Sequence, residues 1–190
     1  MRNNIFKVIV GILFFVLLTG FFGAKGDTPA EKRQEINKMR RQTLAELFRL
    51  VPSARDEIRR AVGYAVFSNV GLNIFVVSTG NGYGVAHDNQ TGRDIYMKMI
   101  SGGVGVGFGV KDFRGVFVFY SRDAFDNFVE HGWTAHGQAD AAAKAADKGA
   151  ALSAAIQIAP GVRLYQLTEN GIAAQATIQG TKYWKDDELN

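Results

Sequence analysis

Apolar residues follow a helical period near the start of the chain and a strand period through most of the rest. At every third or fourth position they form one stripe: Ile36, Met39, Thr43, Leu44, Leu47, Phe48 and Val51. Such a stripe predicts an amphipathic helix. The sequence Thr28-Pro29-Ala30-Glu31 supplies a capping box for the start of this helix, and Pro52 marks its end.

Further capping patterns predict shorter helices. Ser53-Ala54-Arg55-Asp56 predicts a helix that ends near Gly63. Ser121 predicts the N-terminus of another, which closes near Gly132. The alanine-rich stretch 138–156 favours a helix by propensity, although its small side chains also suit a tightly packed strand or loop.

From residue 64 onward the apolar period changes to two, which is typical of β-strands. We expect strands at 64–67, 72–79, 82–87, 94–99, 102–110, 116–120, 162–167 and 172–179. Turn signals at 68–69, 80–81, 88–92 and 112–115 leave connections too short for parallel crossovers. The pattern therefore predicts an antiparallel meander, with the tail at 181–184 packed on the sheet.

Glycine recurs at every second position in two blocks of the strand region. The first block contains Gly80, Gly82 and Gly84, and the second contains Gly103, Gly105, Gly107 and Gly109. Because alternate residues of a strand point to opposite faces, each block has one face almost without side chains. Glycine weakens a strand, so we expect another backbone, a helix or a ligand to approach this bare face closely.

Glycine-rich segments also bind nucleotides, but the spacing disfavours both common arrangements. The dinucleotide fingerprint G-x-G-x-x-G lies between a strand and a helix, whereas these glycines alternate strictly and lead into another strand-like segment. A P-loop needs Gly-Lys-Ser/Thr, whereas Lys111 lies between Val110 and Asp112. Neither arrangement fits the chain.

The first residues resemble an export signal. Arg2 and Lys7 flank the start of an uncharged run that ends at Ala24. This is typical of a secretory signal cut after Gly26, with an uncleaved anchor as the alternative. We therefore expect a signal peptide or anchor at 1–26, a helical lead-in at 27–62 and an antiparallel β domain at 63–190. The predicted fold class is α+β, with N-terminal helices followed by a mainly antiparallel, glycine-rich sheet or partial barrel that carries one or two short helices.

Charge is distributed unevenly along the chain. Residues 31–60 contain nine basic and five acidic side chains, whereas the residues from 61 onward contain ten basic and twelve acidic ones. Attraction to an anionic surface is therefore expected in the helical lead-in. Arg40 interrupts the apolar stripe there, which suits either a core-packing helix with one outward-pointing arginine head or a helix on a membrane surface.

Recognisable catalytic and metal-binding patterns are not found. The chain has no cysteine, no serine lies in G-x-S-x-G, and His131 and His136 are five residues apart rather than four. Asp123, Asp126 and Glu130 are better explained as a solvated helix face. We therefore expect no enzyme activity, no cofactor and no metal, and export with a nearly neutral exported form argues against nucleic acid.

Five motifs in this order resemble the SYLF domain, a lipid-binding module. They are Y-A-V-F-S-N-V (64–70), G-N-G-Y-G-V (80–85), G-G-V-G-V-G-F-G-V (102–110), F-V-F-Y-S-R-D-A-F-D-N-F (117–128) and Y-Q-L-T-E-N-G-I (165–172). The resemblance runs from about residue 55 to the C-terminus. It implies a non-enzymatic phospholipid-binding protein of the bacterial envelope.

Eukaryotic SYLF proteins bind phosphoinositides, some bind or bundle actin, and their lipid contacts are associated with a basic amphipathic N-terminal region. By this resemblance the candidate lipid-binding residues are Lys38, Arg40, Arg41, Arg55, Arg59 and Arg60. The expected partner is an anionic phospholipid or membrane surface, with an envelope protein as the alternative partner of a structural or interaction module. The expected location is the periplasm or the periphery of the envelope, or else an N-terminal anchorage in a membrane. Some bacterial relatives are acylated on a cysteine, which this chain lacks.

Overall fold

The computed structural model describes residues 23–74, 77–104, 109–134, 155–168, 171–172 and 181–190. Within these ranges the helices are α2 (Pro29–Leu50), α3 (Ala54–Arg60) and α4 (Arg122–His131). The long strands are β1 (Gly63–Ile74), β2 (Val77–Asp88), β3 (Asp94–Val104) and β4 (Gly109–Phe119). The shorter strands are β5 (Trp133–Thr134), β6 (Ile156–Ala159), β7 (Val162–Thr168), β8 (Gly171–Ile172) and β9 (Thr181–Lys185).

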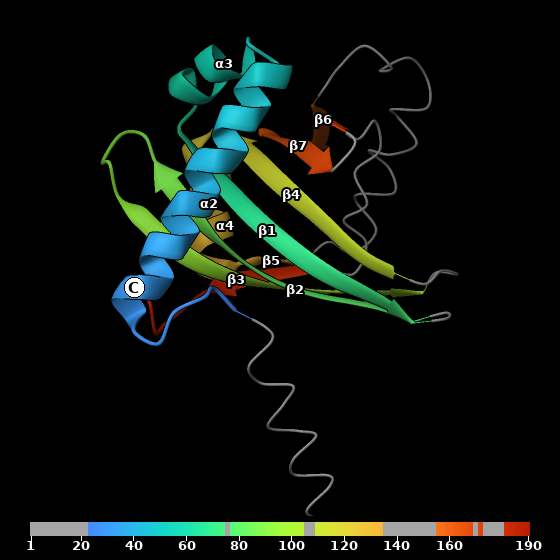
Figure 1. Ribbon diagram of the computed structural model, residues 1–190. Coiled ribbons are helices and arrows are strands. Elements are labelled where there is room, and N and C mark those ends of the chain that lie inside the picture. Colours follow the sequence, from blue (N-terminus) through green and yellow to red (C-terminus); the bar gives the residue numbers. More distant parts are fainter. Residues whose placement is uncertain (1–22, 75–76, 105–108, 135–154, 169–170, 173–180) are drawn as a thin grey trace, which may run out of the picture.

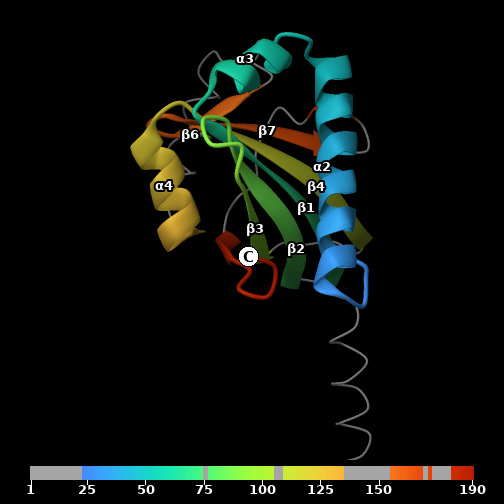
Figure 2. The ribbon, with the colours of Figure 1, turned by 90° about the vertical axis from the view of Figure 1, so that its left-hand side faces the viewer.

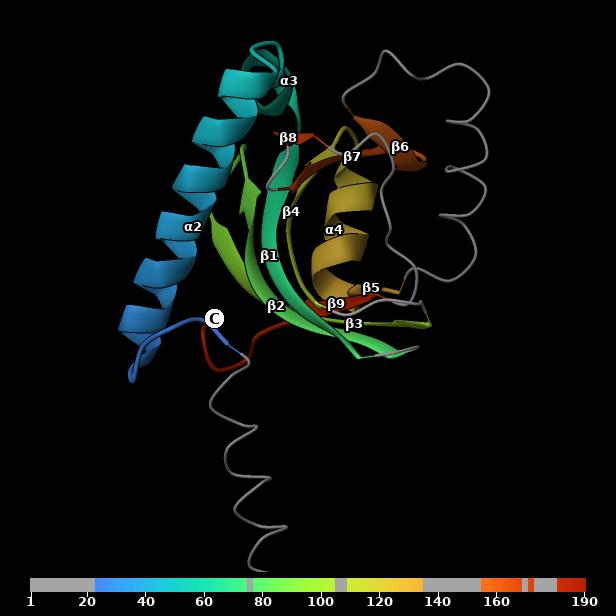
Figure 3. The same ribbon diagram turned by 45° about the vertical axis from the view of Figure 1, so that its right-hand side comes forward.

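The strands form one antiparallel sheet in the order β5-β9-β3-β2-β1-β4-β7-β6, with β8 paired to β7. The sheet curls into a half-barrel (Figure 1). The helix α2 lies across its convex face, and α4 lies inside the curl (Figures 2 and 3). The predicted α+β class, with helices packed on a mainly antiparallel sheet, is confirmed.

The starts of α2 and α4 follow the predicted capping patterns, whereas Ser53 at the start of α3 makes no side-chain capping hydrogen bond. The backbone N–H of Glu31 donates to Oγ1 of Thr28 at 3.2 Å, and the N–H of Thr28 donates to the Glu31 carboxylate at 3.0 Å. Ser121 accepts from the N–H of Ala124 at 3.3 Å at the start of α4. Each cap satisfies backbone donors that the helix itself leaves without partners.

Alternation along the strands builds a hydrophobic core on each side of the sheet. Phe67 of β1 and Phe117 of β4 belong to the core that contains α4. Their neighbours Val66 and Val116 belong to the core that contains α2 and α3. Because successive side chains of a strand point to opposite faces, one strand can supply both cores.

The strands are longer than predicted, and three of the predicted turns are wrong. Residues 68–69, 80–81 and 112–115 lie within strands: Asn69 of β1 is in register with Gly82 of β2 on one side and with Phe113 of β4 on the other. Pairing along both edges of β1 outweighs the local turn preference of these polar residues. The turn at 88–92 is confirmed, because β2 ends at Asp88 and β3 begins at Asp94.

The prediction of one strand at 102–110 is also wrong, because β3 ends at Val104 and β4 begins at Gly109. The glycine run is thus divided between two strands, and residues 105–108 lie outside the described part. The simple meander is corrected as well. The strands β1, β2 and β3 follow one another, but β4 pairs with the free edge of β1.

Three predictions for the C-terminal part of the chain can be compared with the structure. The tail is a strand of the sheet, since β9 pairs with β3 from Met97↔Lys185 to Ser101↔Thr181. Most of the alanine-rich stretch falls outside the described residues, except for its last members, where β6 begins at Ile156. Of the strand predicted at 172–179, only Ile172 is described, as the end of β8.

Candidate functional site

The bare glycine face of β2 packs against side chains of the same sheet. A Cβ on Gly84 would lie 2.4 Å from a ring carbon of Phe67, and a Cβ on Gly82 would lie 2.8 Å from Cγ of Met99. Both positions therefore accept hydrogen only, and the approaching groups come from β1 and β3. Of the other glycines in the pattern, Gly80, Gly103 and Gly109 lie in the backbones of β2, β3 and β4, and Gly105 and Gly107 lie outside the described residues.

Arg40 turns toward the sheet and pairs with a carboxylate. Its Nη1 lies 2.7 Å from Oδ1 of Asp94, and its side chain is 17% exposed. The same Asp94 oxygen lies 2.6 Å from Nδ1 of His87. Both predicted placements of Arg40 are therefore wrong. Its guanidinium points neither to solvent nor to a membrane surface, because Asp94 of β3 lies within its reach.

The ion pair holds Asp94 in its charged form. Burial works to raise the pKa of Asp94, but hydrogen bonds from His87 and Arg40 outweigh burial and hold this pKa below its usual range. His87 and Asp94 face each other in the β2–β3 register, across the turn that joins these strands. The β2–β3 hairpin therefore positions the Asp94 carboxylate that binds Arg40 of α2.

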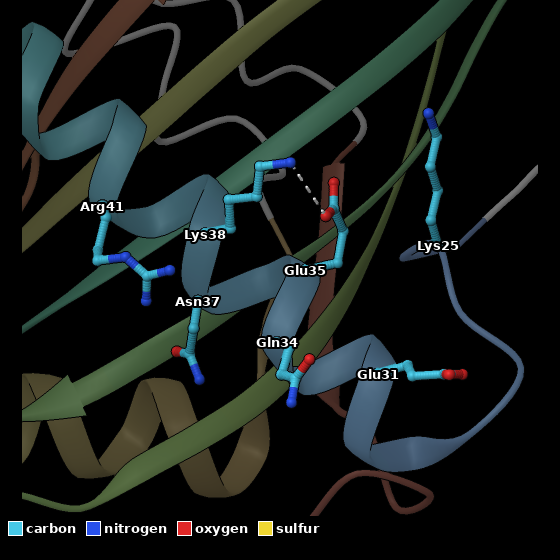
Figure 4. Close-up of a pocket in the computed structure, with 7 residues that line it drawn as sticks. All are labelled: Lys25, Glu31, Gln34, Glu35, Asn37, Lys38 and Arg41. Carbon is cyan, nitrogen blue, oxygen red and sulfur yellow. Dashed lines mark ion pairs between the residues drawn. The ribbon is translucent and has the colours of Figure 1, made fainter.

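Lys38 and Arg41 belong to a shallow hollow of about 460 Å³ beside α2 (Figure 4). It is lined by Lys25 from the segment before the helix and by six residues of α2: Glu31, Gln34, Glu35, Asn37, Lys38 and Arg41. Lys38 lies 3.9 Å from Glu35 and is 60% exposed, so this ion pair is loose. Among the described residues, Arg41 and Lys25 form no ion pair. Because its described wall comes almost wholly from one helix, the hollow is a surface platform rather than an enclosed cavity.

Arg55, Arg59 and Arg60 are exposed on α3, at the C-terminal end of α2 (Figure 1). Arg59 pairs with Asp56 at 3.1 Å and remains 75% exposed. The Arg55 guanidinium lies 4.6 Å from the ring centre of Phe48. Nε of Arg60 donates to the backbone carbonyl of Asp56 at 3.2 Å. These contacts are made at the surface and leave all three guanidinium groups accessible.

A polar network fixes α3 to the sheet and so orients its arginines. Glu57 accepts hydrogen bonds from the hydroxyls of Tyr120 and Tyr165, and from Nη1 of Arg163 at 3.1 Å. Burial and the contact with Glu57 raise the pKa of Tyr165, so this hydroxyl stays a donor at ordinary pH. At the other end of α3, Nδ2 of Asn89 donates to the carbonyls of Ile58 and Ala61 at 2.7 and 3.0 Å.

The structure thus divides the six predicted residues into three groups. Lys38 and Arg41 lie on the exposed side of α2 and the three arginines lie on α3, whereas Arg40 is engaged with Asp94. Exposed cations of this kind can attract phosphates or carboxylates without enclosing them. In the part of the chain that the structure describes, no three histidine, cysteine, aspartate or glutamate side chains come together as ligands for a metal.

Sequence reasoning missed the residues that hold α2 in place. Asp94 and His87 carry a usable signal, because they flank a predicted turn and must then face each other in the hairpin. Two further contacts with α2 carry no such signal: Tyr96 accepts from Asn37 at 2.9 Å, and Glu188 pairs with Lys32 at 2.7 Å. These contacts depend on the sheet order, which the local pattern does not specify.

In the described part of the chain, no helix combines the length and apolarity that crossing a membrane requires. The expected signal peptide or anchor at 1–26 falls largely on residues 1–22, which lie outside that part.

Comparison with known proteins finds a homologue. The chain is 36% identical over 162 residues to Beta cell expansion factor A of Aeromonas veronii. The match covers 85% of this chain but 60% of that protein, so the chain spans less than two thirds of the relative's length. No family model matches the chain. The chain is therefore a homologue of Beta cell expansion factor A over most of its own length.

Proposed function

We propose that this chain is a non-enzymatic phospholipid-binding protein of the SYLF family, which docks on anionic headgroups at the cell envelope. The observation that carries the proposal is the set of exposed cations on α2 and α3. Arg41 has no ion-pair partner among the described residues, and Arg55 and Arg60 make only local contacts with Phe48 and Asp56. These groups can therefore exchange water for lipid phosphate without breaking an internal pair.

The assignment to the SYLF family rests on the five ordered motifs, whose described residues lie mainly in strands and in α4. The first and fourth motifs fall on β1 and on the β4–α4 junction. Homology to Beta cell expansion factor A over 85% of the chain adds a bacterial relative. A phospholipid-binding protein of this family would act in the periplasm or at the periphery of a membrane, after export directed by residues 1–26.

Attachment of this kind is electrostatic and reversible. Each lysine or arginine held near an anionic leaflet contributes about 1 kcal/mol, so several of them give useful affinity together. No cysteine is present to carry an acyl chain. Binding should therefore weaken as salt is added, since exposed charges are screened over about 10 Å at 0.1 M salt.

A structural or protein-interaction module of the envelope is the second candidate. The observation that favours it is the pairing of Arg59 with Asp56 and of Lys38 with Glu35, which gives this surface both signs of charge. A mixed surface suits a protein partner with its own charged pairs better than it suits a uniformly anionic membrane.

Vesicle flotation with the full chain tests the proposal. We expect binding to phosphatidylcholine vesicles that contain phosphatidylglycerol and none to phosphatidylcholine alone. The double variant Arg41→Gln/Arg60→Gln should bind about thirtyfold more weakly, from about 1 kcal/mol for each cation. The matched control, Arg93→Gln/Lys182→Gln, removes two exposed cations outside α2 and α3 and should bind like wild type.

Two results would contradict the proposal. One is equal binding to neutral and anionic vesicles, and the other is equal loss in the two double variants. An envelope protein captured by wild type in detergent, and lost in Arg41→Gln/Arg60→Gln, would favour the second candidate instead.

A further inference from the structure

The last five residues of the chain form a compact turn against the sheet, here called the C-terminal hook (residues 186–190). Asp186 is 5% exposed and Leu189 is 3% exposed. The Asp186 carboxylate lies 2.8 Å from Nζ of Lys98 on β3 and accepts from the N–H of Glu188 at 3.1 Å. A buried, internally bonded turn of this kind has a defined position on the sheet.

The hook lies along the edge of β3 beyond the point where its pairing with β9 ends. Along β3, the pairing with β9 reaches only to Met97. Beyond that point, Tyr96 donates its N–H to Oδ1 of Asn190 at 3.0 Å, and its carbonyl accepts from Nδ2 of Asn190 at 2.8 Å. The carbonyl of Tyr96 also accepts from the N–H of Asp186 at 3.0 Å. One side-chain amide thus takes the place of a strand backbone.

The same hook is tied to α2 by two routes. Directly, Nζ of Lys32 on α2 lies 2.7 Å from the Glu188 carboxylate. Indirectly, the hydroxyl of Tyr96 accepts from Nδ2 of Asn37 on α2 at 2.9 Å. In Figures 1 and 2 the C-terminus lies beside the first turns of α2. Loosening the hook would therefore loosen the N-terminal half of α2.

The apolar face of α2 can serve only one partner at a time. Ile36 and Leu47 are fully buried and Met39 is 5% exposed, all against the convex face of the sheet. The outer side of α2 carries the cations Lys38 and Arg41, and a helix with one apolar and one cationic side can lie in a lipid interface with its apolar face down. Docking on the sheet and insertion into lipid therefore compete for the same side chains.

We propose that the C-terminal hook is a latch: it holds α2 closed on the sheet, and its release transfers the apolar face of α2 to an anionic lipid surface. This inference rests on the proposed function. The closed form meets the membrane through the outer cations of α2 and α3, and the open form exchanges the outer side of α2 for its apolar face. Weakening the latch should then strengthen membrane binding without any change in charge.

The substitution Asn190→Ala tests the latch, because it removes the amide that holds Tyr96 and leaves the net charge unchanged. In the full chain we expect faster hydrogen exchange in the first half of α2. We also expect about fivefold tighter binding to vesicles that contain phosphatidylglycerol, which corresponds to the loss of one net hydrogen bond from the closed form. Residues 1–26 are present in both proteins, so their contribution cancels.

Asn89→Ala is the matched control. Asn89 also uses its amide to hold backbone carbonyls, but those carbonyls belong to Ile58 and Ala61 at the end of α3. This variant should speed hydrogen exchange in α3 and leave the first half of α2 unchanged. A locked variant, Lys32→Cys/Glu188→Cys joined by a flexible bismaleimide, should abolish the gain produced by Asn190→Ala. The absence of other cysteines makes this cross-link specific.

The outcomes separate the two proposals. Unchanged hydrogen exchange of α2 in Asn190→Ala overturns the latch. Faster exchange without tighter vesicle binding, in a protein whose wild type binds vesicles, overturns the transfer of α2 to lipid. If neither protein binds vesicles, the proposed function fails, the transfer fails with it, and the exchange measurement alone decides whether the hook restrains α2.

Discussion

The two faces of the sheet are covered in different ways. On the concave side, rings from β1, β4, β9 and α4 pack edge to face, as where Tyr183 meets Phe67 with ring centres 4.8 Å apart and Phe117 with ring centres 5.3 Å apart. On the convex side, the sheet presents aliphatic residues such as Val66, Val85 and Val116, together with Tyr96 and Tyr165, to the short helix α3 and to the long helix α2. That helix is also tied by polar side chains, including the pair Arg40–Asp94.

The difference separates a core that defines the fold from a layer that rests on it. Aromatic contacts inside the curl join strands that are far apart in sequence, so they stabilise the curled sheet as a whole. The contacts of α2 join one helix to a sheet that is already paired along its edges. The polar ties fix the register of α2, and each of them can be broken by water or by a charged surface.

Removal of one ring should show the largest contrast between the two faces. Phe117→Ala on the concave side should lower the free energy of unfolding by about 4 kcal/mol, through lost burial and a cavity. Val118→Ala, one residue away on the convex side, should cost about 2 kcal/mol. Both side chains are 1% exposed or less. Urea unfolding measures both values, and equal losses would mean that the two faces contribute alike.

A methyl group added to the glycine face should test how tightly the concave side is packed. Gly84→Ala would place a carbon 2.4 Å from the Phe67 ring and should cost about 2 kcal/mol by overpacking. Gly115→Ala is the control on the same face, because its new carbon would lie 3.4 Å from Leu164, an ordinary contact. Thermal unfolding compares the two. A Gly84→Ala protein as stable as the Gly115→Ala protein would show that the face has room.

Acid should weaken the convex layer through Asp94. The pKa of Asp94 is lower in the folded protein, so its charged form adds stability above the ordinary carboxyl pKa of about 4, and this stability is lost as pH falls below that value. Asp94→Asn should cost about 1 kcal/mol at pH 7 and nothing at the lowest pH. Unfolding free energies from pH 7 to pH 2 check this. If the unfolding free energies of wild type and Asp94→Asn changed with pH in parallel, Asp94 would not be the source of the acid sensitivity.

Local signals in the sequence were sufficient for α2 and α4. The caps at Thr28 and Ser121 and the stop at Pro52 lie next to the helix ends that they specify, and α2 and α4 have the predicted positions. The fold class also followed from the change of period at residue 64. In each case the information lies within one element and its immediate flanks.

The strand boundaries could not be predicted from local sequence, because they depend on pairing with neighbouring strands of the sheet. Asn69 has the character of a turn residue, yet it lies in the middle of β1 because β2 and β4 pair with it from both sides. For the same reason the bare glycine face could be recognised, but the groups that pack on it could not. Phe67 and Met99 reach Gly84 and Gly82 only in the assembled sheet.

The candidate site was recognised in composition but not in arrangement. Helical spacing alone places Arg40 on the apolar stripe, and only the β2–β3 hairpin supplies the Asp94 that receives it. The C-terminal hook could not be predicted from local sequence either, because the hydrogen bond between Asn190 and Tyr96 joins residues 94 positions apart. Such a contact depends on the order of all the strands between them.

The position of Tyr183 has a consequence for the timing of folding. Its ring packs on Phe67, Phe117 and Phe128, yet it belongs to the last strand of the chain. A polypeptide made from its N-terminus therefore cannot complete the concave core before β9 has been synthesised. Contacts across such sequence distances also slow folding, because the loops between them must close first. The concave core of the nascent chain therefore stays incomplete, with its other aromatic rings lacking one partner, until β9 has been made.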